Sequence, residues 1–249
     1  MLMLNKILFL LVVLLSNIIQ GITGFAGTVL AMPVSTLLVG FETAKPILNV
    51  LGILAGLYIV ITSYKNIDKR EFLKITCVMV FGIVGGMFLK GLFTGNPTLM
   101  YRLLGAIVIA VGTVGIIKSF IKKKDGDADK KQNPVLSYSL LITSGIVHGM
   151  FVCGGPLLVS YLTGRLKDKD KFRATISAVW VVLNTVIMID DIRAGYFSKE
   201  LVILLAVSAA VMFAAMAIGS VLYKKMSREL FMKITFVLLI ISGISLFIK

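Results

Sequence analysis

Charged residues divide this chain into long stretches that contain no Lys, Arg, Asp or Glu. The eight longest span residues 7–41, 46–64, 75–89, 103–117, 135–164, 174–189, 201–223 and 234–248. A helix needs about 20 apolar residues to cross a hydrocarbon core of roughly 30 Å, and several stretches reach that length. Of the 249 residues, 58% are hydrophobic and only 15% are charged, which no ordinary soluble domain matches. We therefore expect an all-α polytopic membrane protein surrounded by the lipid bilayer, and not a barrel of short alternating strands.

The formal net charge of +14 would suggest nucleic acid as the partner of a soluble protein. Here the basic residues lie between apolar stretches, and cytoplasmic loops of membrane proteins carry an excess of Lys and Arg. We therefore expect no nucleic-acid partner. The single histidine, His148, excludes a His-rich metal site, and the two cysteines, Cys77 and Cys153, form no CxxC motif. Neither a metal nor a cofactor is expected.

The distribution of the basic residues favours one topology. If every apolar stretch crossed the membrane once, one side would hold 14 Lys and Arg and the other 12. If residues 7–41 and 135–164 instead fold back at their glycines, 19 of the 26 basic residues lie on one side. The positive-inside rule makes that side cytoplasmic. The sequence thus predicts a multi-pass protein of the bacterial inner membrane with both termini extracytoplasmic.

This topology divides the chain into two inverted repeats, each a broken-helix hairpin plus three transmembrane helices. The N-terminal repeat is expected at 1–121 and the C-terminal inverted repeat at 135–249, joined by a basic cytoplasmic linker at 122–134. Inverted repeats with broken helices recur in transporters. A shift of 128 residues between the halves pairs Gly21 with Gly149, Gly27 with Gly155, Ser16 with Ser144 and Lys45 with Arg173.

Both hairpins turn at small residues, TGFAGT at 23–28 and CGGP at 153–156. Backbone freed from a helix inside a membrane must be satisfied by protein or line a wet cavity. A helix that restarts after Gly27 or Gly155 exposes unpaired N–H groups and the positive end of its dipole, and Pro156 fits its first turn. Two such ends that meet near the midplane would bind an anion. The alternative is that the glycines allow close helix packing.

The same hypothesis makes small and polar residues of the hairpins and the following spans candidates for binding a small anionic substrate. They are Gln20, Gly21, Thr23, Gly24, Gly27, Thr28, Lys45, Asn49, His148, Gly149, Cys153, Gly154, Gly155, Pro156, Arg173, Ser177 and Asn184. For the polar members the alternative is a structural hydrogen bond between helices, and for Cys153 a small buried residue. For Lys45 and Arg173 it is a loop charge that reaches back to the interface.

Two carboxylates, Asp190 and Asp191, end the span that begins near residue 174. At the end of a span they are interpreted as a solvated interfacial pair, with proton coupling as the alternative. A proton gradient is the expected energy source, because no GxxxxGK[ST] motif for ATP is present. Whether the protein forms a homodimer is left open.

At the two hairpins the chain resembles the TauE/SafE sulfite exporter family, the type that includes 4-toluene sulfonate uptake permeases. The family pattern is an aromatic or apolar residue, about three glycines, then apolar residues and a proline. FAGTVLAMP at 25–33 follows it with Ala26 and Thr28 in glycine places, and VCGGPLLVS at 152–160 follows it with Cys153 in a glycine place and Ser160 in the proline place. This register pairs Gly27 with Gly154.

The resemblance implies transport of sulfur-containing anions such as sulfite, thiosulfate, sulfoacetate or other organosulfonates. The expected function is therefore a secondary transporter that works by alternating access, with the anion held by broken-helix ends where the repeats meet. An anion channel is one alternative. An intramembrane enzyme, with His148 as base and Cys153 as nucleophile, is another, although an enzyme is not expected.

Overall fold

The computed structural model describes residues 3–92, 96–120, 134–162, 165–225, 227–245 and 247, which form α-helices and no strand. The first half contains α1 (Met3–Thr23), α2 (Ala26–Val39), α3 (Phe41–Ser63), α4 (Lys69–Leu92) and α5 (Pro97–Phe120), with a short 3₁₀ helix at Tyr64–Asn66. The second half contains α6 (Pro134–Phe151), α7 (Gly155–Leu162), α8 (Lys169–Arg193), α9 (Lys199–Lys225) and α10 (Arg228–Ser245).

Within the described residues, six helices are long and apolar enough to cross a membrane: α1, α3 with its 3₁₀ extension, α4, α6, α8 and α9. Large apolar side chains also cover outward faces, as on α1, where Leu4, Ile7, Leu11 and Leu15 are exposed. Such a continuous apolar exterior would be unstable in water but suits lipid. The expectation of a helical multi-pass membrane protein is confirmed.

The two breaks lie inside the stretches that were expected to fold back. α1 ends at Thr23 and α2 begins at Ala26, and the intervening Gly24 has a φ of 81°, a backbone conformation that favours glycine. The Nδ2 of Asn5 donates to the carbonyl of Leu38 over 3.1 Å, so the far end of α2 returns to the start of α1. The second break separates α6 from α7 at residues 152–154.

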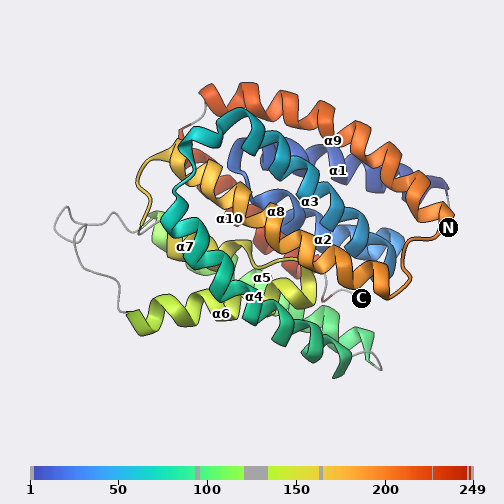
Figure 1. Ribbon diagram of the computed structural model, residues 1–249. Coiled ribbons are helices and arrows are strands. Elements are labelled where there is room, and N and C mark those ends of the chain that lie inside the picture. Colours follow the sequence, from blue (N-terminus) through green and yellow to red (C-terminus); the bar gives the residue numbers. More distant parts are fainter. Residues whose placement is uncertain are drawn as a thin grey trace.

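The helices pair between the halves in a reciprocal way. α1 packs on α9 and α6 packs on α4, while α3 pairs with α8 and α5 with α10. In Figure 1 the helices α2, α3 and α8 lie between the α1–α9 pair and the α4–α6 pair. The hairpin of each half is therefore held by the second long helix after the hairpin of the other half.

Two of the candidate glycines serve this packing. A Cβ on Gly21 would lie 3.0 Å from the Cα of Gly219 in α9, and a Cβ on Gly149 would lie 2.4 Å from the carbonyl oxygen of Ile83 in α4. Backbones that approach so closely leave no room for a side chain. For Gly21 and Gly149 the packing alternative holds.

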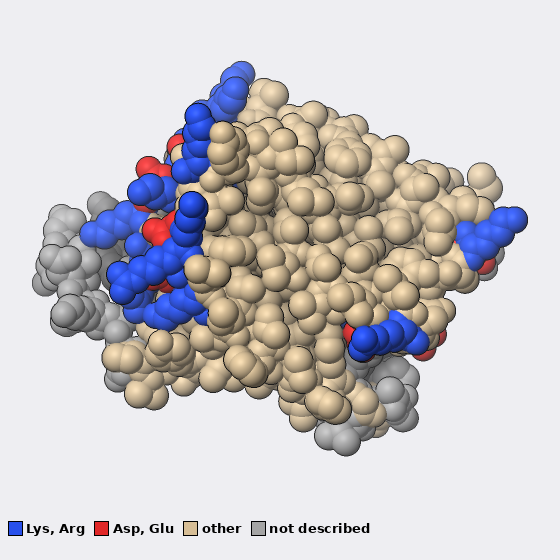
Figure 2. All heavy atoms as spheres, in the orientation of Figure 1, with Lys and Arg blue, Asp and Glu red and all other residues tan. Residues whose placement is uncertain are grey.

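Basic side chains gather at one end of the molecule, as Figure 2 shows. This end, which we call the basic end, is formed by the 3₁₀ helix and the start of α4, the loop before α8 and the end of α9, with basic residues Lys65, Lys69, Arg70, Lys74, Arg165, Lys167, Lys169, Lys171, Lys224 and Lys225. The opposite end carries Lys6, Arg193 and Lys199. Of the linker expected at 122–134, only Pro134, the first residue of α6, lies within the described residues.

Candidate functional site

The first hairpin turn is closed by its own side chains. The hydroxyl oxygen of Thr23 accepts hydrogen bonds from the backbone N–H groups of Phe25 and Ala26, each over 3.1 Å. The side-chain oxygen of Gln20 accepts from the N–H of Gly27 over 2.7 Å. α2 therefore begins at Ala26, before Gly27, and the N–H groups of these two residues already have partners. For Ala26 and Gly27 the expectation of unpaired N–H groups at this helix start is wrong, because Thr23 and Gln20 cap them.

The second hairpin turn uses His148 in the same way. Its Nδ1 accepts from the N–H of Gly154 over 3.4 Å, and its Nε2 lies 2.7 Å from the Oδ1 of Asn184. A ring nitrogen that accepts carries no proton, so this pattern places the proton of a neutral imidazole on Nε2, from which it is donated to Asn184. Among the described residues, the N–H groups of Gly155 and Leu157 in the first turn of α7 have no acceptor.

Gly27 and Gly154 occupy matching positions. A Cβ on Gly27 would lie 2.7 Å from the Cβ of Gln20, and a Cβ on Gly154 would lie 2.8 Å from the Cβ of His148. Each glycine N–H also donates to the same side chain that its Cβ would strike. These contacts fit the register that pairs Gly27 with Gly154 and not the shift of 128 residues. Both glycines let the restarting helix approach the helix before the turn.

A small cavity lies where the two hairpin turns meet. Its volume is about 10 Å³, room for about one water molecule. Five residues of the first half and five of the second line it: Gln20, Phe25, Thr28, Val29, Gly52, His148, Val152, Gly155, Trp180 and Asn184. We call this space the central cavity. It brings together five of the candidates, Gln20, Thr28, His148, Gly155 and Asn184, from both halves of the chain.

Two lining residues that the sequence analysis missed explain the character of the central cavity. Gly52 is needed because a Cβ there would lie 2.5 Å from the amide nitrogen of Asn184. Trp180 is 4% exposed and stacks obliquely on His148, with ring centroids 4.6 Å apart. Its indole Nε1 has no hydrogen-bond partner among the described residues. Trp180 is the only Trp of the chain and precedes Asn184 by four residues, which puts both on the same face of α8. Because Asn184 was already a candidate, this spacing could have identified Trp180 as well.

No charged side chain lines the central cavity. The described lining combines apolar residues with the amides of Gln20 and Asn184, the hydroxyl of Thr28, the imidazole of His148 and the indole of Trp180. A carboxylate would repel an anion, and its absence from this lining removes that obstacle. The side chains of Gln20, His148, Trp180 and Asn184 are buried, which strengthens any hydrogen bond that they make to a charged ligand.

Lys45 lies elsewhere, in an ion pair that the sequence analysis did not anticipate. Its Nζ donates to the Oδ1 of Asp191, and both side chains are buried, with exposed fractions of 1% and 0%. The interpretation of Asp191 as a solvated interfacial residue is wrong, because helix α3 covers it. Lys45 is likewise no loop charge at the interface. Asp190, the neighbour of Asp191, is half-buried.

Arg173 caps the end of α1. Its Nε and Nη2 donate to the carbonyl of Gly21 over 3.1 and 2.6 Å, and its guanidinium stacks 4.5 Å over the ring of Tyr223. The last carbonyls of a helix lack partners within it, and a cation there also opposes the helix dipole. One turn further along α8, the hydroxyl of Ser177 donates to the carbonyl of Gly24 over 3.4 Å. Both residues of α8 thus hold the first hairpin and do not line the central cavity.

The remaining candidates lie beside the central cavity. The Nδ2 of Asn49 donates to the backbone carbonyl of Asn184 over 3.0 Å, which links α3 to α8. Cys153 is buried in the second turn, and no hydrogen bond joins it to His148 among the described residues. Pro156 is the second residue of α7, where its missing N–H costs nothing. Within the described part of the chain, no three His, Cys, Asp or Glu residues lie together as metal ligands would.

The fold and the central cavity define a class of protein. Broken helices that meet inside a bundle of membrane-spanning helices, with polar groups near the break, recur in membrane transport proteins. The family model of the sulfite exporter TauE/SafE matches residues 8–246 of the 249-residue chain. The chain belongs to this family of membrane transport proteins. No curated protein and no solved structure matches it.

Proposed function

We propose that this protein is a secondary transporter of small sulfur-containing anions: sulfite, thiosulfate, sulfoacetate or other organosulfonates. The anion binds in the central cavity, and transport proceeds by alternating access. The observation that carries the proposal is the indole N–H of Trp180, a buried donor with no partner among the described residues, which lines the point where both broken helices meet. A buried unsatisfied donor costs about 1–3 kcal/mol, and a ligand bound in the cavity that this donor lines would remove that cost.

Other donors support the same site. Within the described part of the chain, the N–H groups of Gly155 and Leu157 lack acceptors, and they lie at the positive end of the α7 dipole. An oxyanion of sulfur presents several oxygens in three dimensions and can accept from Trp180, from α7 and from Thr28 at once. The described lining residues offer such an ion hydrogen bonds from uncharged donors.

The central cavity must widen for an anion to enter, because about 10 Å³ admits little more than a water molecule. We propose that the halves 1–121 and 135–249 are inverted repeats whose relative rocking opens the cavity to one side and then to the other. The basic end faces the cytoplasm, so both termini lie outside a bacterial inner membrane. The reciprocal pairing of α1 with α9 and α6 with α4 supports a twofold relation between the halves.

Calorimetry on detergent-purified protein tests this proposal with sulfite, sulfate, thiosulfate, sulfoacetate, taurine and a carboxylate of matched size. We expect selective binding of a sulfur oxyanion. Liposomes loaded with the bound anion should then show counterflow that saturates with concentration. A conductance without saturation would establish the channel alternative instead. Binding of none of the six compounds would refute the sulfur-anion site.

A further inference from the structure

The Lys45–Asp191 ion pair joins the two halves of the protein inside the membrane-spanning region. Lys45 lies in the first turns of α3 and Asp191 in the last turn of α8. Removing two charges from water is expensive, and apolar residues of the same volume often give equal or greater stability. An ion pair with both side chains at or below 1% exposure is therefore weak evidence for stabilisation and calls for another role.

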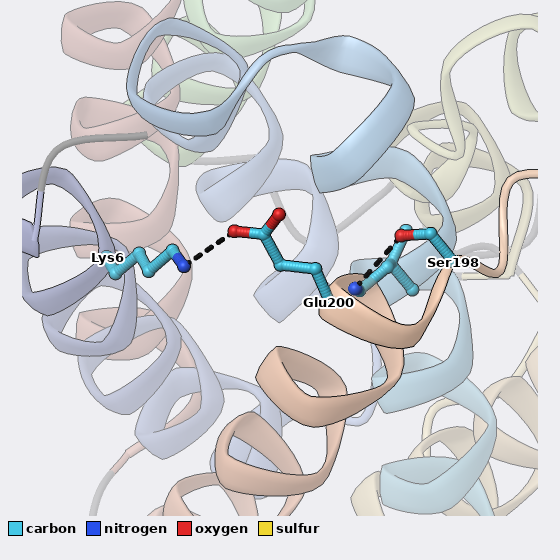
Figure 3. A network of polar contacts seen from close by, with 4 residues as sticks. Lys6, Ser198 and Glu200 are labelled. Atoms are coloured by element: carbon cyan, nitrogen blue, oxygen red, sulfur yellow. Dashed lines mark hydrogen bonds and ion pairs between the residues drawn. The ribbon is translucent and has the colours of Figure 1, made fainter.

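An open hollow of about 270 Å³ lies beside this pair, at the end opposite the basic end. It is lined by Glu42, Thr43, Gly195, Tyr196, Ser198, Glu200, Leu201 and Leu204, and we call it the outer vestibule. The N–H of Tyr196 donates to the backbone carbonyl of Asp191 over 3.2 Å, which joins the vestibule wall to the backbone of Asp191. Figure 3 shows Glu200 in this wall, paired with Lys6 of α1 over 2.7 Å, next to Ser198.

On its inner side the pair is linked to the central cavity through Asn49. Asn49 follows Lys45 by four residues, so it lies on the same face of α3 one turn further in. It donates to the backbone of Asn184, whose side chain lines the central cavity. The Oδ1 of Asn49 is buried and has no hydrogen-bond partner among the described residues. An ammonium group released from its carboxylate would find an acceptor there, one turn closer to the central cavity.

We propose that Asp191 carries the proton that couples transport. Lys45 then changes its ion-pair partner from Asp191 to the transported anion. A proton from the outer vestibule binds the carboxylate of Asp191 and makes it neutral. Lys45 keeps its charge and pairs with the incoming anion in place of the carboxylate. One proton thus enters with each anion, and for a monovalent anion the net charge of the site is the same before and after loading. The inference rests on the proposed function, because it needs an anion to replace Asp191.

Other charged and titratable groups face the Lys45–Asp191 pair, but none of them takes the role of Asp191 in the proposed exchange. These groups are Glu42 of α3, Asp190 of α8, Tyr196 of the loop after α8, Glu200 of α9 with its partner Lys6 of α1, and His148 of α6. Of the carboxylates among them, Asp190 is half-buried, Glu42 is exposed and Glu200 is held by Lys6 at the vestibule. Asp191 differs from these three carboxylates because it is fully buried against an ammonium group.

Calorimetry in two buffers of different ionisation enthalpy counts the protons taken up per anion bound. The probes are thiosulfate and methanesulfonate, which do not themselves titrate near neutral pH. For the wild-type protein we expect one proton per anion and a Kd that rises up to tenfold per pH unit on the alkaline side. Asp191→Asn should bind with no proton uptake and with a Kd independent of pH. Asp190→Asn is the matched control on the same helix and should retain the wild-type count.

The outcomes separate this inference from the proposed function. Wild-type binding of either probe without proton uptake overturns the role of Asp191 and leaves the proposed function standing, and this result needs no variant to fold. Loss of the proton in Asp190→Asn, or its retention in Asp191→Asn, also overturns the assignment. If the wild-type protein binds neither probe nor any anion of the calorimetry panel, the proposed function itself fails.

Discussion

The sharpest prediction concerns the indole N–H of Trp180. Because this is the only Trp of the chain, growth of a tryptophan auxotroph on 3-benzothienylalanine replaces the N–H by sulfur at this one position. The isostere keeps the ring volume and the stacking on His148, whose centroid lies 4.6 Å away. Since the N–H has no partner within the described protein, we expect no loss of thermal stability in detergent from its removal.

The affinity for the anion should respond very differently. A hydrogen bond to a charged acceptor contributes about 1.5–3 kcal/mol, which corresponds to about a 10- to 150-fold increase in Kd when it is lost. Calorimetry with the best-binding anion measures this change. Trp180→Phe should show the same loss of affinity, with an added loss of stability because the smaller ring leaves a void.

A control distinguishes a ligand donor from any unpartnered buried group. Ser208 of α9 also has a buried hydroxyl without a partner among the described residues, but it does not line the central cavity. Ser208→Ala should leave the Kd unchanged. A folded isostere that binds the anion within twofold of the wild-type Kd would refute the reasoning that an anion satisfies Trp180.

Three further outcomes are expected. Gly27→Ala should lower stability by about 1–3 kcal/mol, because the new Cβ would lie 2.7 Å from a packed side-chain carbon, whereas Gly155→Ala, with 3.3 Å of clearance, should fold normally; equal melting temperatures would contradict the capping geometry. Lys45→Met should cost about 3–5 kcal/mol by leaving a buried carboxylate uncompensated, and adding Asp191→Leu should restore most of it; a double variant no more stable than the single one would speak against a closed pair. Single cysteines at 122–131 should resist an impermeant thiol reagent applied to intact cells, and labelling from outside would reverse the assigned topology.

The hairpin turns show how far spacing alone can predict a site. Glycines within an apolar stretch indicated where the helices break, and the polar residue before each turn was identified in both halves. The spacing could not predict the direction in which these polar side chains point. Gln20 and His148 turn back to accept N–H groups from Gly27 and Gly154, because the chain reverses within a few residues and brings them together. A side chain interpreted as a ligand for substrate is therefore, at least in part, a cap for the turn itself.

The basic candidates show the opposite failure. Lys45 and Arg173 stand at equivalent places after the two hairpins, and both were expected as candidates for binding an anion. The structure gives them different partners, a carboxylate of α8 for Lys45 and a helix-end carbonyl for Arg173. Neither partner is near in sequence, so nothing short of the packed bundle could reveal that one is an ion pair and the other a cap.

Local properties of the chain determined its class: uncharged stretches of membrane length require helices, Lys and Arg cluster between these stretches, and glycines permit the breaks. Those properties depend on short-range sterics and on the transfer of side chains between water and lipid, which each segment carries alone. Only the tertiary structure decided which polar groups find a partner within the protein and which do not. The unpartnered N–H of Trp180 and the buried pair of Asp191 with Lys45 exist because helices distant in sequence pack together, and packing alone sets which polar atoms find partners.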